Sequence, residues 1–281
     1  MFRFALVVTL ALHVNAADPV RIRLVASNLS SGNQQSYDPG HGARILQGLK
    51  PDIILIQEFN IGDNSEPSVK GFVTTNFGPT FTFFREKAGP GRIPNGVISR
   101  YPILASGFWD DQAVSNREFV YARIDIPGNR DLWVVSVHLL TNDRKRPDEA
   151  KALAGLIQRN VPEAAYLVIG GDLNTDDMRD QTFARLRTVV EIPAALPADG
   201  SGKSGTNRGR GKPYDHVLAD RDLQPLRTPV VIGTSRFENG LVFDSRVFNP
   251  LSAVAPVKRD DSNAQNMQHM AVVRDFLVPV P

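Results

Sequence analysis

The sequence predicts an α/β protein in which strands and helices are mixed along the chain. Short apolar runs end abruptly in polar residues, which is typical of buried strands. Residues 146–161 carry an apolar stripe at helical spacing. The 281 residues, of which 42% are hydrophobic and 22% charged, have the composition of a globular protein. No internal repeat or linker divides the chain, so we expect a single domain over residues 18–281.

The N-terminal half is predicted to be rich in strands. We expect strands at residues 21–29, 52–58, 80–85, 95–100, 119–126 and 132–138. Gly128-Asn129 predicts a hairpin turn between the last two of them. A short helix at residues 43–49 is stopped by Pro51. Residues 59–79 show no clear period, and we expect an irregular loop there.

The C-terminal half begins with the clearest helix, at residues 146–161. Pro147 suits its first turn, and Asp148 and Glu149 complement the helix dipole. We also expect strands at residues 166–171, 214–218 and 271–278, and a shorter helix at residues 180–189. Residues 198–213 are Gly-rich and basic, and residues 233–268 predict a long loop with a short strand or two.

Residues 1–17 are typical of a signal peptide. Met1-Phe2-Arg3 gives a basic start, residues 4–14 are nearly all apolar, and Ala16-Ala17 offers small residues for cleavage. The apolar run is too short to span a bilayer, although an uncleaved anchor stays an alternative. We therefore expect a secreted or periplasmic protein that has no transmembrane anchor after cleavage.

Two features of the composition exclude classes of function. The chain has no cysteine, so thiol catalysis is excluded. Its net charge of +2 predicts no general affinity for nucleic acid, so any site for a polyanion must be local.

Several predicted strands end next to side chains that can bind a metal ion, a proton or a phosphate. These candidate residues are Asn28, Glu58, His138, Asp172, Asn174, Asp215 and His269. Asp172 and Asn174 lie two residues apart in an extended segment, so both side chains point the same way. Taken alone, this pair is explained equally well by a surface turn after a core strand. The whole set has no serine nucleophile motif beside it and favours metal-assisted attack by water.

The same residues lie in motifs that resemble those of a known superfamily. The motifs are LVASNL around Asn28, Gln57-Glu58, NGVISRYP at residues 95–102, Asn116-Arg117-Glu118, Ser136-Val137-His138-Leu139, Gly171-Asp172-Leu173-Asn174, Tyr214-Asp215-His216 and Gln268-His269. In order and content the sequence resembles the endonuclease/exonuclease/phosphatase superfamily and is similar to deoxyribonuclease I. The resemblance implies a four-layered sandwich, in which two mainly antiparallel β-sheets pack face to face with helices outside.

The resemblance also implies a metal and a water-activating base. Glu58 would bind a divalent cation, Mg²⁺ or Mn²⁺, with Asn28 close to the metal and the phosphate. Asp172 would orient and deprotonate the attacking water, and Asn174 would donate a hydrogen bond to the phosphoryl group.

Three further residues receive roles by resemblance. His269, paired with Asp215, would act on the phosphate as a hydrogen-bond donor or proton carrier. His138 would donate to a phosphoryl oxygen or to the leaving group. Arg117 would hold a phosphate with its guanidinium fork, although an ordinary salt bridge is an alternative for it.

The chain departs from the family pattern at Gln268, where an Asp usually precedes the final His. The loss of this carboxylate predicts a single metal ion or a weaker metal site. The leading expectation is a secreted nuclease-type phosphodiesterase, because residues 85–92 and 203–212 are basic and nucleic acid is a polyanion. The alternatives are a sphingomyelinase-type phospholipid phosphodiesterase and a phosphate-binding module disabled by Gln268. We expect a monomer with no stable protein partner.

Overall fold

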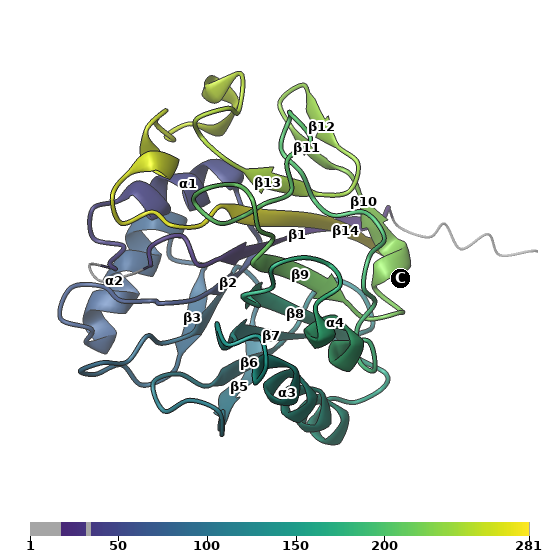
Figure 1. Ribbon diagram of the computed structural model, residues 1–281. Helices are drawn as coiled ribbons and strands as arrows, with labels where there is room; N and C mark the ends of the chain where they lie inside the picture. The colour runs from purple at the N-terminus through teal and green to yellow at the C-terminus, as the bar shows by residue number, and fades with distance from the viewer. Residues whose placement is uncertain (1–17, 32–34, 281) are drawn as a thin grey trace, which may run out of the picture.

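The computed structural model describes residues 18–31 and 35–280, and the predicted signal peptide at residues 1–17 lies outside them. One sheet contains seven strands, β1 (Val20–Ser27), β2 (Ile53–Ile56), β3 (Thr82–Arg85), β4 (Gly96–Ser99), β10 (Arg227–Thr228), β13 (Leu241–Phe243) and β14 (Ala271–Val278). A second sheet contains five strands, β5 (Ile103–Trp109), β6 (Phe119–Ile124), β7 (Leu132–His138), β8 (Tyr166–Asp172) and β9 (Asp215–Ala219). The hairpin of β11 (Val230–Ile232) and β12 (Ser235–Phe237) projects beside the first sheet (Figure 1).

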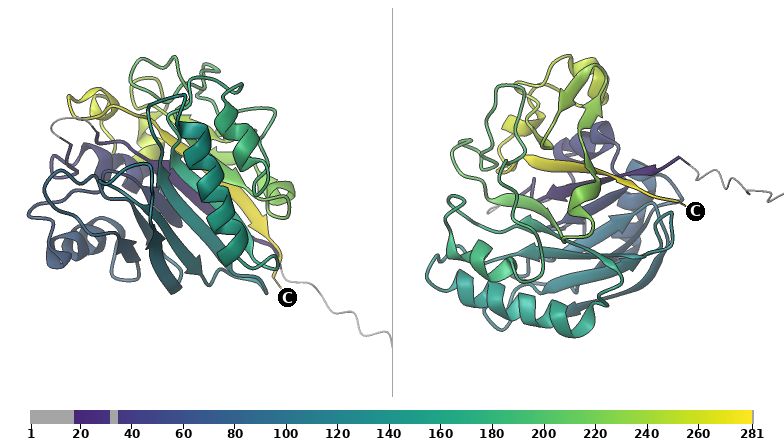
Figure 2. Two further views of the ribbon diagram at one scale, coloured as in Figure 1. Left: turned by 60° about the horizontal axis from the view of Figure 1, so that its bottom comes forward. Right: turned by 90° about the vertical axis from the view of Figure 1, so that its right-hand side faces the viewer.

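Four α-helices lie outside the sheets in the described residues. They are α1 (His41–Leu49), α2 (Glu66–Phe77), α3 (Arg146–Asn160) and α4 (Gln181–Leu186). α1 and α2 pack on the seven-stranded sheet, and α3 and α4 pack on the five-stranded sheet (Figure 1). Figure 2 shows α3 running along the outer face of its sheet. Among the described residues no helix is long and apolar enough to cross a membrane.

The layers are held together by three buried apolar clusters. One lies between the two sheets and joins residues such as Leu24 and Leu55 to Val134 and Val168. The other two lie under the two helix layers. The pairs β1–β2 and β7–β8 are parallel, and all other strand pairs of the two sheets are antiparallel. The predicted four-layered sandwich of mainly antiparallel sheets is therefore confirmed.

Two parts of the secondary structure differ from the expectation. Residues 59–79 contain the helix α2, whose start is fixed by the Ser65 side chain, which accepts from the amide of Ser68. The helix buries only Val69 and Val73, so its apolar period is weak. Strand β5 was not expected either. It is an edge strand with a register shift after Ile103, and most of its side chains are exposed. Its sequence therefore lacks the alternation of apolar and polar residues that marks a half-buried strand.

A polar bridge crosses the apolar interior between the sheets just below the strand ends. Gln57 follows β2, and its Nε2 donates to Ser136 Oγ on β7 at 2.8 Å. Ser136 Oγ in turn donates to the carbonyl of Ile56 at 3.1 Å. Gly171 lies against this bridge with φ 137°, and a Cβ there would approach Val137 O to 2.1 Å. Only glycine fits this position, because both the backbone conformation and the space exclude a side chain.

We predict that Gly171→Ala destabilises the protein by about 3 kcal/mol or more, because a left-handed conformation and a backbone clash are combined. Urea unfolding followed by circular dichroism measures this change. Gly89→Ala is the matched control, since a Cβ there meets nothing within 4 Å and the expected change is within about 0.5 kcal/mol. Equal stability of the two variants would contradict the close packing at Gly171.

Candidate active site

Three neighbouring strands of the five-stranded sheet place His138, Asp172 and Asp215 level with one another. The parallel register of β7 and β8 pairs His138 with Asp172, and the antiparallel register of β8 and β9 pairs Asp172 with Asp215. The amide of Leu139 continues the ladder by donating to the carbonyl of Asp172 at 2.8 Å. The three side chains therefore form a row at one end of the sheet, and all three are buried.

The seven-stranded sheet brings Asn28 and Glu58 to the same place. Asn28 follows β1, and its Nδ2 donates to Asp172 Oδ2 at 2.8 Å and to Glu58 Oε1 at 3.5 Å. The His138 ring lies between the same two carboxylates, with Nε2 3.4 Å from Asp172 Oδ2 and Nδ1 3.9 Å from Glu58 Oε1. Asp172 is thus in contact with groups from both sheets.

His269 completes the cluster from the segment that leads into β14. Its Nδ1 lies 2.8 Å from Asp215 Oδ2 and 3.9 Å from Asp172 Oδ2. Burial alone lowers the pKa of His269, but the charges of Asp215 and Asp172 raise it to about 9. His269 is therefore an imidazolium at neutral pH. Thr206, which sequence reasoning missed, donates from Oγ1 to Asp215 Oδ2 at 2.7 Å and fixes that carboxylate.

His138, in contrast to His269, is neutral. Burial lowers its pKa to about 3, because the charge of Asp172 does not compensate for the loss of water and Arg117 and His269 act in the same direction as burial. A neutral imidazole carries one N–H and one acceptor nitrogen. Among the described residues Nδ1 of His138 has no hydrogen-bond partner although it is buried. The site thus pairs a neutral histidine with a charged one.

Two site residues adopt the left-handed backbone conformation. Glu58 has φ 50° and Asn174 has φ 52°. Such a conformation costs a non-glycine residue about 1–3 kcal/mol and persists only where the surroundings impose it. The conformation of Asn174 is held by two hydrogen bonds of that residue. Its backbone amide donates to Asp172 Oδ1 and its side-chain Nδ2 donates to the carbonyl of Leu139, both at 2.8 Å. One of the two hydrogens on Nδ2 remains for another acceptor.

Arg117 lies behind His138. Its Nε donates to the carbonyl of His138, and its Nη2 donates to the carbonyl of Leu139 at 3.1 Å. Its Nη1 donates to Asn116 Oδ1 at 3.1 Å. The guanidinium thus holds the end of β7, and its predicted contact with phosphate stays a prediction. Gln268 is exposed beside the cluster, and its amide donates to the carbonyl of Leu29 at 3.0 Å.

Several cations of the basic segments that favoured a polyanion are paired within the protein. The Arg210 side chain is 7% exposed, and its Nη2 and Nη1 lie 2.8 Å from Asp199 and 2.6 Å from Asp244. Arg208 donates to the carbonyls of Asn263, Ala264 and Gln265, and Lys212 lies 2.7 Å from Asp176. Arg92 pairs with Glu86 at 2.7 Å. Arg92, Arg210 and Lys212 are thus paired with carboxylates, whereas Lys87 and Lys203 are exposed.

The site has donors that suit a divalent cation. Asp172, Asp215 and His269 each offer a ligand atom, and these atoms lie within 4.8 Å of one another. Asn28 contacts both Asp172 and Glu58, and Asn28 Oδ1 is a buried oxygen without a hydrogen-bond partner among the described residues. His269 is protonated and bonded to Asp215, so the oxygens of Asn28, Glu58 and Asp172 fit best. Carboxylate and amide oxygens suit Mg²⁺ or Mn²⁺.

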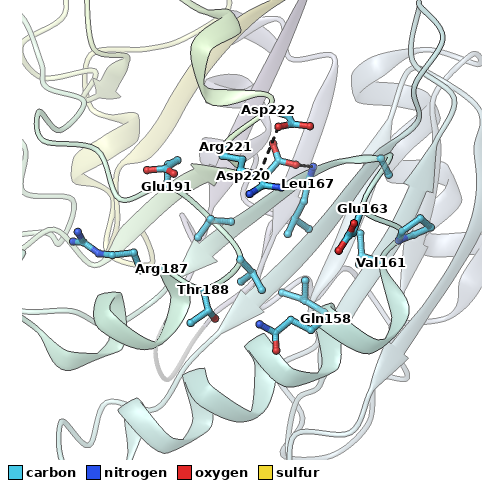
Figure 3. Close-up of a pocket in the computed structure, with 15 residues that line it drawn as sticks. Gln158, Val161, Glu163, Leu167, Arg187, Thr188, Glu191, Asp220, Arg221 and Asp222 are labelled. Carbon is cyan, nitrogen blue, oxygen red and sulfur yellow. Dashed lines mark hydrogen bonds and ion pairs between the residues drawn. The ribbon is translucent and has the colours of Figure 1, made fainter.

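A cavity of about 620 Å³ lies at the other end of the same sheet (Figure 3). It is lined by the end of α3, residues 187–191 after α4 and residues 220–222 after β9. Leu167 lies near the start of β8 and Asp172 at its end, which is a separation of roughly 17 Å along the strand. The lining includes none of the predicted site residues, so this cavity is distinct from the cluster of histidines and carboxylates.

Comparison with known proteins agrees with the geometry. The model of the Endonuclease/Exonuclease/phosphatase family matches residues 17–236. The chain belongs to this family. Enzymes of the family are generally phosphoric ester hydrolases and generally use divalent metals. A search of curated proteins by sequence found no match.

Solved structures of the same fold cover nearly the whole chain. A beta toxin from Staphylococcus aureus is 13% identical with a TM-score of 0.56, and the alignment covers 90% of this chain and 99% of the toxin. TDP2 from Caenorhabditis elegans is 13% identical with a TM-score of 0.56, and the alignment covers 92% of this chain and 75% of TDP2. A protein of the same family from Leptotrichia buccalis is 15% identical with a TM-score of 0.57, and the alignment covers 90% of this chain and 98% of the other protein. At these identities the likeness concerns the fold alone.

We predict that Mg²⁺ at ten times its dissociation constant raises the free energy of unfolding by about 1.4 kcal/mol. Glu58→Gln should abolish most of this increase, because the amide removes a charge from the metal site. Gln268→Asp should strengthen metal binding, because it adds a carboxylate beside the site. Urea unfolding with Mg²⁺ or EDTA, together with titration calorimetry, provides the measurement.

The control for this prediction is Glu66→Gln, which makes the same charge change at an exposed position of α2. It should leave metal binding unchanged. Full stabilisation by Mg²⁺ in Glu58→Gln would contradict the assignment of Glu58. An unchanged metal dependence in Gln268→Asp would contradict our account of that position.

Proposed function

We propose that the protein is a divalent-metal-dependent phosphodiesterase that hydrolyses its substrate by in-line attack of an activated water. The observation that carries this proposal is Asp172, a buried carboxylate in contact with Asn28, His138 and His269. The sequence has no cysteine and no motif of a serine nucleophile that could form a covalent intermediate. A carboxylate placed among donors, next to groups that can hold a cation, suits the activation of water.

The roles of the residues follow from their contacts and charges. Asp172 would accept the proton of the attacking water. The imidazolium of His269, held by Asp215 and Thr206, would donate a hydrogen bond to the phosphoryl oxygens, where negative charge develops. The neutral His138 and the remaining hydrogen of Asn174 would donate to the same group or to the leaving oxygen. A divalent cation held by Glu58, Asn28 and Asp172 would supply further positive charge to that group.

Nucleic acid is the proposed substrate. The motif Asn116-Arg117-Glu118 is similar to the nuclease branch of the family. A phospholipid headgroup is the second candidate. It is favoured by the pairing of Arg92 and Arg210 with carboxylates, which leaves fewer cations to follow a long polyanion.

One assay panel separates these substrates. The mature protein is incubated with plasmid DNA, RNA and sphingomyelin liposomes, each with Mg²⁺ or EDTA. Nicking of DNA or cleavage of RNA that EDTA abolishes supports the nuclease. Release of choline phosphate supports the phospholipid alternative. The absence of any turnover together with binding of polyanions would support a disabled phosphate-binding module.

We predict that Asp172→Ala lowers turnover of the accepted substrate by at least about 10²-fold, because a positioned base contributes this much to hydrolysis. Circular dichroism and the unfolding midpoint should show that the variant remains folded. Asp176→Ala is the control, since this neighbouring carboxylate is exposed and pairs with Lys212. Near-normal turnover in Asp172→Ala would overturn the mechanism.

We also propose that the protein is exported and acts as a monomer of one domain over residues 18–281. The support is the signal-peptide pattern of residues 1–17. N-terminal sequencing of protein recovered from the medium or the periplasm should find a start after Ala16 or Ala17. Light scattering should find the mass of one chain.

A further inference from the structure

The chain that leaves β7 is held by buried charged side chains of α3. We call residues 138–141 the β7 exit segment. Arg146 is 1% exposed, and its Nη1 donates to the carbonyls of Leu140 and Thr141 at 3.0 and 3.2 Å. Glu149, on the same face of α3, accepts from the amide of Leu140 through Oε2 at 2.7 Å. The position of His138 therefore depends on α3 as well as on the sheet.

Glu149 lies against a second buried carboxyl group, that of Asp111. The two side chains are within hydrogen-bonding reach of each other, and the residues are 3% and 2% exposed. Asp111 Oδ1 accepts from the amide of Ala113 at 3.0 Å. The remaining oxygens, Asp111 Oδ2 and Glu149 Oε1, have no donor from any other described residue. Two ionised carboxylates only accept hydrogen bonds, so a bond between them requires a proton.

We propose that Asp111 and Glu149 share one proton, and that this protonated pair is a positioning device for the β7 exit segment. The proton joins the loop after β5 to the first turn of α3. The amide of Leu140 is then held by Glu149, and His138 lies two residues earlier in the chain. The pair touches neither substrate nor metal and acts through His138. This second role rests on the function proposed above, whereas the sharing of a proton does not.

The surroundings of the pair favour the protonated form. Burial raises the pKa of Glu149, and the hydrogen bond and charge of Asp111 raise it further, to about 8. Burial likewise raises the pKa of Asp111. Of the charged groups around the pair, Arg117 lowers both pKa values, and Glu118, whose Oε2 accepts from the amide of Asp111 at 2.9 Å, raises that of Asp111. Arg92 is bonded to Glu118, and Arg146 to Asp180.

The proton gives the stability of the fold a characteristic dependence on pH. The ordinary pKa of a glutamate is 4.5, and in the folded protein Glu149 titrates at about 8. Between these values the folded protein keeps the proton and the unfolded chain has released it. This stabilisation is complete below pH 4.5 and is lost progressively as pH rises to about 8. Over this window the unfolding constant should increase by up to about tenfold per pH unit because of this group.

Glu149→Gln is the informative variant. Its amide can donate to Asp111 and its carbonyl can accept from Leu140, so the contacts are kept without a proton. We expect the ratio of the unfolding constants of wild type and Glu149→Gln to increase about tenfold per pH unit between pH 5.5 and 7.5 and to level off above pH 8. Urea unfolding of the mature chain at these pH values gives the ratio. Asp148→Asn, the neighbouring exposed carboxylate on α3, should follow wild type. A ratio independent of pH overturns the shared proton.

The positioning role has its own readouts. Glu149→Ala leaves the amide of Leu140 without its acceptor, so the ring signals of His138 in NMR spectra should shift, and Glu149→Gln should restore them. With an accepted substrate, Glu149→Ala should lower kcat about tenfold or more with little change in KM. The kcat of wild type should fall above pH 8, where that of Glu149→Gln does not. Unshifted His138 signals in Glu149→Ala would overturn the positioning role whether or not a substrate has been found.

Discussion

The register of β7, β8 and β9 is the constraint on which the candidate active site depends. It places His138, Asp172 and Asp215 level on three adjacent strands of the five-stranded sheet. A slip of one residue would turn a side chain to the opposite face of the sheet, so the row exists only in this register. The bridge from Gln57 to Ser136 and the close approach of Gly171 to Val137 couple the register to the packing of the other sheet. Fold and site are thus set by the same contacts.

Asp172 is the residue where both sheets meet, and this has an electrostatic consequence. Glu58, Asp172 and Asp215 are all buried in one cluster, and His269 contributes one positive charge to it. Buried charges are tolerated only when they are paired or coordinate a metal. Two negative charges are left over when the three carboxylates are ionised and His138 is neutral. One divalent ion would balance this charge, and the single metal expected from Gln268 stays a prediction.

The sequence is most informative where one short motif determines both the local conformation and the chemistry. The strand ends at Glu58, His138 and Asp172 could be predicted because an apolar run stops at a polar residue, and the structure brings these residues together. Helix α2 was missed although Ser65-Glu66-Pro67 is a typical helix start, because only two of its residues are buried. The short motif around Asp172 predicts its neighbour Asn174 but not the left-handed conformation that orients it.

Contacts between residues far apart in the chain could not be predicted. Thr206 supports Asp215 from a loop, and nothing in its local sequence indicates this role. The basic residues near position 210 suggested a surface for a polyanion, but Arg210 is paired with Asp199 and Asp244, which are 11 and 34 residues away. The contact of Asp111 with Glu149 could not be predicted either. In the sequence each residue is an ordinary carboxylate, and both are buried only by the packing of α3. A count of charges along a sequence does not distinguish solvated side chains from paired ones.

This internal pairing bears on how a substrate is selected. In the proposed mechanism, positive charge at the site would come from the imidazolium of His269 and from a divalent cation, both directed at a single phosphoryl group. Arg92, Arg210 and Lys212 are paired with carboxylates, which leaves fewer cations in the basic loops to bind neighbouring phosphates and to release counterions on binding. Discrimination between substrates would then depend on the groups attached to the phosphate and on the loops that contact these groups. The fold and the catalytic groups can therefore be the same in enzymes that act on different phosphodiesters.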